Sequence, residues 1–239
     1  MGCPGSHSRL VLGGLTVMNA ANVTSATNMA PAELTAADLA AWIRRSHELV
    51  AEHADELTRL DSAIGDADHG VNMKRGLASA VEVLDPIPDS PEIVLKKVAM
   101  TLIARVGGAS GPLYGTFFLR MAAVSAGRRG LDLAALVAAV EAGVSGIAQR
   151  GRAEAGDKTM LDAWLPALDS LRSGADLRAA LQTAAAAADA GRAATESMLA
   201  TKGRASYLGE RSIGHIDPGA SSAALVVRAF ADVVDGCAS

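Results

Sequence analysis

Apolar residues recur at helical spacing along most of the chain. After Thr35, the side chains of Leu39, Trp42, Ile43 and Leu57 fall on one face of a helix. The same pattern, separated by turn residues, predicts eight helical segments. Their expected positions are 36–60, 72–84, 91–106, 112–126, 133–150, a segment from 158 that contains Pro166, 176–200 and 219–234.

Start and stop signals support these segments. Thr35 and Asp38 have the spacing of a capping box, and Ser90 followed by Pro91 is a common helix start. Pro166 is expected to kink or break the sixth segment. Aromatic residues make up only 3% of the chain, and alanine and leucine dominate, so an all-α fold is expected rather than a sheet. Most connections are short, which makes sequential helices antiparallel neighbours.

Bulk properties exclude several classes of protein. The 239 residues are 50% apolar, enough for one large core. The net charge of -4, without a basic stripe, argues against nucleic-acid binding, and no apolar run has the length of a membrane-spanning helix. Cys3 and Cys237 form neither a metal-binding pattern nor a disulfide framework, which is typical of a reducing cytoplasm.

The N-terminal residues 1–28 lack helical periodicity and are rich in Gly, Ser, Asn and Thr. Arg9 and the apolar run 10–18 resemble a signal peptide, but Gly13 and Gly14 interrupt that run. We therefore expect residues 1–28 to form a disordered extension, or to precede the true start at Met29. Residues 29–239 are expected to form one domain.

The connection at 61–72 concentrates charge. Asp61, Asp66 and Asp68 lie within eight residues, beside Gly65 and Gly70. Clustered carboxylates repel unless a cation neutralises them, and hard oxygen ligands suit magnesium. The amides that start the following helix would suit a phosphate. An equally plausible interpretation is that Asp68 caps this helix and the other aspartates form Asx turns.

Three further connections contain candidate site residues. Segment 107–116 is a glycine-rich helix entry that lacks a Walker lysine, and a tight turn between closely packed helices is the more common use of such a segment. In 151–160, Met160 is either core or a wall for a base or ribose. In 203–219, Arg204 and Arg211 could meet phosphate, whereas a solvated loop with Asp217 as helix cap is the alternative, and a lone His215 is more often structural.

Four strings make the chain recognisable: GDADHG, GGASGPLYGT, GDKTMLD and RASYLGERSIGHIDPGA. In this order they closely resemble the L subunits of dihydroxyacetone kinases, a domain that also forms the C-terminal half of single-chain dihydroxyacetone kinases. The resemblance runs from about Ala32 to the C-terminus. It implies a closed barrel of eight antiparallel amphipathic helices that binds a nucleotide at one end.

The resemblance also implies a site. Asp61, Asp66 and Asp68 would hold two Mg²⁺ ions that bridge the phosphates of ADP or ATP. The residues that match nucleotide contacts in this family are His69, Gly70, Val71, Asn72, Ser110, Gly111, Gly151, Met160, Arg204, Asp217, Pro218 and Gly219.

By the same resemblance, the substrate dihydroxyacetone is held by a separate K subunit, through a histidine-linked adduct. A phosphohistidine protein of the phosphotransferase system, the M subunit, would recharge bound ADP. An ATP-dependent kinase, a kinase for another short ketose such as a tetrulose, and a non-catalytic regulatory helical module are the alternatives. Self-association as a homodimer is also compatible with the sequence.

Overall fold

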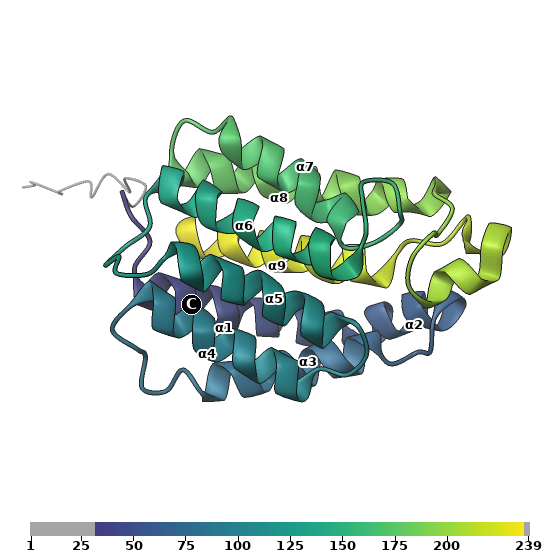
Figure 1. The fold of residues 1–239 in the computed structure, drawn as a ribbon, viewed down its shortest axis with the longest axis horizontal. Coiled ribbons are helices and arrows are strands. Elements are labelled where there is room, and N and C mark those ends of the chain that lie inside the picture. Colours follow the sequence, from purple (N-terminus) through teal and green to yellow (C-terminus); the bar gives the residue numbers. More distant parts are fainter. Residues whose placement is uncertain (1–31, 237–239) are drawn as a thin grey trace, which may run out of the picture.

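The computed structural model describes residues 32–236, whose regular elements are helices joined by loops (Figure 1). This range contains no β-strand, and one antiparallel bridge joins Leu34 to Leu131. The expected extension, residues 1–28, and both cysteines lie outside the described residues. The helices are α1 (Ala36–Glu52), α2 (Ala54–Ile64), α3 (His69–Glu82), α4 (Pro91–Arg105), α5 (Ser110–Val124), α6 (Leu133–Gly151), α7 (Leu161–Arg172), α8 (Leu177–Ala194) and α9 (Pro218–Val234), with two 3₁₀ helices, η1 (Thr195–Ser197) and η2 (Arg204–Ser212).

Local signals account for most helix starts. The Thr35–Asp38 capping box is confirmed, because each side chain bonds to the other residue's backbone amide. Ser90 caps α4 with Pro91 in the first turn, as expected. The carboxylates of Asp132 and Asp176 cap α6 and α8 in the same way.

One expectation about helix continuity was wrong, and a second was contradicted in part. The first segment is not one helix, because the backbone leaves helical geometry at His53 and starts again as α2. No break occurs at Pro166, since α7 continues through it. Proline leaves the carbonyl four residues earlier, that of Asp162, without its usual donor. A Cβ atom on Gly191 of α8 would lie 2.0 Å from this oxygen, so glycine allows the two helices to approach there.

Most helices run along the long axis of the molecule, whereas α2 and the yellow-green segment that contains η2 lie together at one end (Figure 1). Successive helices α3 to α9 pack side by side, and α1 packs against both α3 and α9. In the core, Trp42 of α1 stacks on Phe230 of α9 with ring centroids 4.2 Å apart and donates a hydrogen bond to the carbonyl of Val226 at 2.8 Å. This contact fastens the first long helix to the last.

Contrary to the expectation from the sequence, one of the described helices, α6, has the length and apolar composition of a membrane-spanning helix. It packs between α5 and α7, and its apolar residues include Leu136, Val140 and Ile147 of the core. We therefore assign α6 as a partly buried core helix.

The two tryptophans predict a difference in stability. Trp42→Phe removes a buried hydrogen bond and part of a stacked pair, so we expect it to lower the free energy of unfolding by about 2–3 kcal/mol. Trp164→Phe is the matched control, since its buried Nε1 has no hydrogen-bond partner among the described residues. Its loss should be smaller, and urea unfolding measures both. Equal losses would contradict the role of the Trp42 hydrogen bond.

Candidate functional site

The four glycine- and aspartate-rich connections meet at one end of the helical bundle and enclose a cavity of about 380 Å³. Its walls come from the α2–α3 loop, the α4–α5 loop, the end of α6 with the loop before α7, and the segment that leads into α9. The volume falls in the range of small-molecule sites. Residues remote in the sequence are thus brought to one place.

The three aspartates converge on this cavity. Ligand oxygens of Asp61, Asp66 and Asp68 lie within 4.8 Å of one another. Asp61 is buried at the end of α2, and its Oδ2 accepts the amides of Asp68 at 2.9 Å and His69 at 3.1 Å. A Cβ atom on Gly65 would lie 2.0 Å from Asp61 Oδ1, so only glycine at this position avoids a clash with the carboxylate. Such a convergence of hard oxygen atoms fits a divalent cation such as Mg²⁺.

The alternative role for Asp68, as a capping side chain, is not what the structure shows. Asp68 occupies the N-cap position of α3, but its carboxylate makes no capping hydrogen bond. The carboxylate of Asp61 binds the first amide of the helix instead. A carboxylate oxygen of Asp68 lies instead within the acidic cluster.

Most of the candidate residues line the cavity, and Gly70, Val71 and Gly111 do not. A Cβ on Gly70 would lie 2.0 Å from the carbonyl oxygen of Ala54, and one on Gly111 would lie 2.3 Å from that of Val106. Both glycines thus permit close helix packing, which is the more common role anticipated for the segment that contains Gly111. Gly70 and Val71 also lie in the first turn of α3, where amides have no acceptor within the helix. Their contact with a nucleotide stays a prediction.

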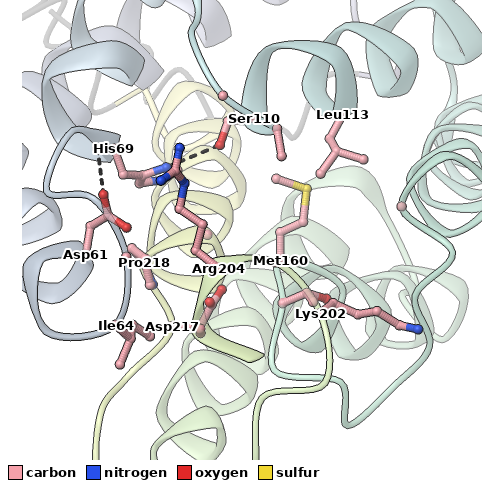
Figure 2. Close-up of a pocket in the computed structure, with 18 of the residues that line it drawn as sticks. Asp61, Ile64, His69, Ser110, Leu113, Met160, Lys202, Arg204, Asp217 and Pro218 are labelled. Carbon is pink, nitrogen blue, oxygen red and sulfur yellow. Dashed lines mark hydrogen bonds between the residues drawn. The ribbon is translucent and has the colours of Figure 1, made fainter. Parts of the chain in front are cut away.

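A buried hydrogen-bond chain supports the floor of the site. Tyr114 Oη and His69 Nε2 each lie 2.9 Å from Ser222 Oγ, which also donates to the carbonyl of Gly219 at 3.0 Å. Because Ser222 has one proton, this arrangement assigns the Nε2–H tautomer to His69. Its Nδ1 then accepts from Ser110 Oγ at 3.2 Å, a contact marked in Figure 2. Burial lowers the pKa of His69 and raises that of Tyr114, so both are neutral near pH 7.

Asp217, which also lines the cavity, has a structural role at the start of α9. Its buried carboxylate caps α9 by accepting the amide of Ala220 at 2.7 Å, as expected for a helix start followed by proline. Burial raises its pKa to about 7, against the opposing effect of this hydrogen bond. Met160 is also buried, and in Figure 2 its side chain lies beside Leu113 at the other side of the cavity. The core and binding interpretations of Met160 are therefore both compatible with its position.

The two arginines behave differently. Arg204 is two-thirds exposed and its Nη2 lies 3.0 Å from Asp66 Oδ2, so it lines the cavity while paired with the acidic cluster. Arg211 does not line the cavity, and neither does His215, which is exposed. Lys202 lines the cavity too, and in Figure 2 its side chain extends away from the other labelled residues.

Several lining residues were not anticipated. Leu113, Ile147, Arg150 and Ala153 belong to or adjoin helices, where their sequence pattern is that of ordinary core or surface positions. Lys158 lies inside a motif that was singled out, although no role was assigned to it. No signal in a single sequence distinguishes an apolar cavity wall from core.

These features define an all-helical protein whose carboxylate-rich pocket suits a phosphorylated ligand with a divalent cation. A family model described as the DAK2 domain matches residues 63–232. The chain belongs to the DAK2 domain family.

Among its relatives is "PEP-dependent dihydroxyacetone kinase, ADP-binding subunit DhaL" of Escherichia coli, 46% identical over 195 residues, which cover 80% of this chain and 93% of the relative. The human "Triokinase/FMN cyclase" is 38% identical over 186 residues, 75% of this chain but 32% of the human protein. The dihydroxyacetone kinase of C. freundii, solved in complex with AMP-PNP and Mg²⁺, superposes with a TM-score of 0.67 at 25% identity, covering 94% of this chain and 38% of that one.

The raised pKa of Asp217 predicts a pH dependence of stability. Between about pH 4 and pH 7 the folded protein keeps a proton that the unfolded chain loses, so raising the pH across this window should reduce the contribution of this carboxyl to stability. The difference between the two states is worth up to roughly 4 kcal/mol. Asp217→Asn retains a capping oxygen but does not titrate. Its unfolding free energy should vary less with pH.

Urea unfolding of both proteins between pH 4.5 and 8, without nucleotide or divalent cations, measures this difference. Parallel pH profiles for the two proteins would show that Asp217 titrates normally.

Proposed function

We propose that this chain is the ADP-binding subunit of a PEP- and phosphotransferase-system-dependent dihydroxyacetone kinase. The observation that carries the proposal is the cavity in which three converging carboxylates face a helix N-terminus and a glycine-rich turn. The identity of 46% to a relative named as an ADP-binding subunit, over 93% of that relative, also supports the proposal. Its place of action would be the cytoplasm.

In this proposal Asp61, Asp66 and Asp68 hold two Mg²⁺ ions. Magnesium would neutralise the phosphate oxygens and align the transferred group. The first-turn amides of α3 and the Ser110 region would bind the phosphates, since helix N-termini favour anions. Arg204, already paired with Asp66, lies where it can add a positive charge.

The base and ribose would lie towards the apolar wall. Leu113, Ile147 and Met160 supply apolar surface there, and Gly151 leaves space because a Cβ atom at this position would meet nothing closer than 3.5 Å. A closed helical barrel would give this site its rigid rim. The cyclic order of packing, from α1 through α3 to α9 and back to α1, supports that description.

The acceptor would come from another protein. We propose that a K subunit holds dihydroxyacetone against the open end of the cavity, and that a phosphohistidine M subunit recharges the bound ADP. The choice of ketose would then belong to the K subunit.

Asp66 tests the metal-dependent binding. Asp66→Ala removes one carboxylate from the cluster and frees Arg204, so we expect the variant to stay helical but to bind ADP at least about tenfold more weakly in the presence of Mg²⁺. Isothermal titration with and without Mg²⁺ measures this. Asp55→Ala, at an exposed aspartate of α2 outside the cavity, is the matched control. Undiminished, magnesium-independent ADP binding by Asp66→Ala would contradict the proposed magnesium site.

The division of labour can be tested by activity. Phosphoryl transfer needs donor and acceptor aligned at close range. The purified chain with Mg²⁺, ATP and dihydroxyacetone should therefore form essentially no phosphorylated ketose in a coupled assay. Adding the K subunit, with the M subunit and its phosphoryl donor where ADP must be recharged, should restore turnover. Substantial turnover by the chain alone, after repeated purification, would place an acceptor site within it.

A further inference from the structure

Lys158 is a buried cation in the wall of the candidate nucleotide site. It lies in the loop between α6 and α7 and is only 1% exposed. Its Nζ donates to three backbone carbonyls, at 2.6 Å from Thr195, 3.2 Å from Met198 and 2.5 Å from His215. A lysine ammonium has three N–H donors. These carbonyls therefore use its whole hydrogen-bonding capacity, and none remains for a phosphate.

The three carbonyls belong to both ends of one segment. Thr195 is the C-cap of α8 and Met198 is the C-cap of η1. Carbonyls near helix C-termini lack N–H donors within the helix and attract cations. His215 lies at the far end, two residues before Asp217. Lys158 thus joins the start and the finish of residues 198–217, the segment that carries Arg204.

The neighbouring residue, Asp157, forms hydrogen bonds with the same segment. The Asp157 carboxylate accepts the hydroxyl of Thr201, and its carbonyl accepts the Thr201 amide at 3.2 Å. Near the end of the segment, the amide of Gly214 donates to the carbonyl of Glu196, which lies just before the segment, at 2.8 Å. Residues 157 and 158 therefore hold the base of the segment from the α6–α7 loop.

The backbone of Lys158 indicates that its side chain is needed. Its φ is +61°, in the left-handed region, which costs a non-glycine residue about 1–2 kcal/mol. Glycine would adopt this conformation without strain, but it would supply no ammonium. Strained conformations of this kind persist where the surrounding structure fixes them, and the three hydrogen bonds of the Lys158 ammonium do so here.

We propose that Lys158 is a positioning residue, whose ammonium holds residues 198–217 in the shape that places Arg204 and the Asp217–Pro218–Gly219 turn around the ligand. The part that concerns nucleotide affinity rests on the proposed function. The part that concerns the shape of the segment does not. A lysine in a nucleotide site is commonly a phosphate ligand. Here the three carbonyls occupy all three N–H donors of the ammonium, so none is left to bind a phosphate.

Hydrogen exchange without nucleotide tests the shape of the segment. Lys158→Met should speed exchange of the hydrogen-bonded amides of Ala200, Thr201 and Gly214 by about tenfold or more, because the segment loses its anchor. The matched control is Lys97→Met, which removes an exposed lysine on α4 that donates to the carbonyl of Val83, outside the cavity. It should leave these amides unchanged. Lys158→Gln serves as the second variant if Lys158→Met does not fold.

Titration with ADP and Mg²⁺ tests the consequence for binding. Lys158→Met should raise the Kd by about tenfold or more, the usual effect of losing hydrogen bonds to a charged group. In Lys158→Ala, added propylammonium matches the atoms removed and should restore affinity, whereas 1-propanol should not. Equal rescue by 1-propanol would reduce Lys158 to a space filler and overturn the proposal.

Two further outcomes separate the ideas. Weaker ADP binding with unchanged exchange would identify Lys158 as a direct phosphate ligand and overturn the positioning role, as would unchanged exchange and unchanged binding. If the wild-type chain bound no ADP with Mg²⁺, the proposed function would fail. The exchange experiment would still decide whether Lys158 anchors the segment.

Discussion

Repulsion among the carboxylates of Asp61, Asp66 and Asp68 constrains the whole functional end of the molecule. Like charges with ligand oxygens within 4.8 Å are unfavourable unless positive groups or hydrogen-bond donors compensate them. The structure supplies two compensations from the chain itself, the amides at the start of α3 and the guanidinium of Arg204. The amides and the guanidinium each connect the acidic loop to another part of the fold. A divalent cation would be a third source of positive charge that suits the cluster.

This constraint explains why the loops are ordered as they are. The amides reach Asp61 only because α2 ends and α3 begins across a short glycine-containing turn. Arg204 reaches Asp66 only because the long segment before α9 lies against α2. That segment is in turn held at its base by Lys158 and Asp157. The acidic cluster, the arginine and the buried lysine therefore form one connected arrangement rather than separate features.

The helical scaffold gives the arrangement its rigidity. Trp42 fastens α1 to α9, and the chain of Tyr114, Ser222 and His69 joins α5, α9 and α3 beneath the site. The hydrogen bond between His69 and Ser222 has a defined direction. Ser222 uses its single proton on the carbonyl of Gly219, so the Nε2 of His69 must be the donor, and this determines the tautomer of His69. Its neutral imidazole can then accept the hydroxyl of Ser110 without adding a charge beside the acidic cluster.

The sequence by itself determined the helical class, most helix starts and many of the residues that line the cavity. Capping side chains such as Thr35 and Asp132 act on amides within a few residues, so their effect is visible locally. The break at His53, the continuity of α7 through Pro166 and the role of Lys158 were decided by tertiary structure. Gly191 of another helix approaches the carbonyl that Pro166 leaves without its donor, and the carbonyls that bind Lys158 lie 37 to 57 residues away along the chain. Likewise, Leu113 and Ile147 look like core residues in the sequence. Only packing shows that part of their surface faces a cavity.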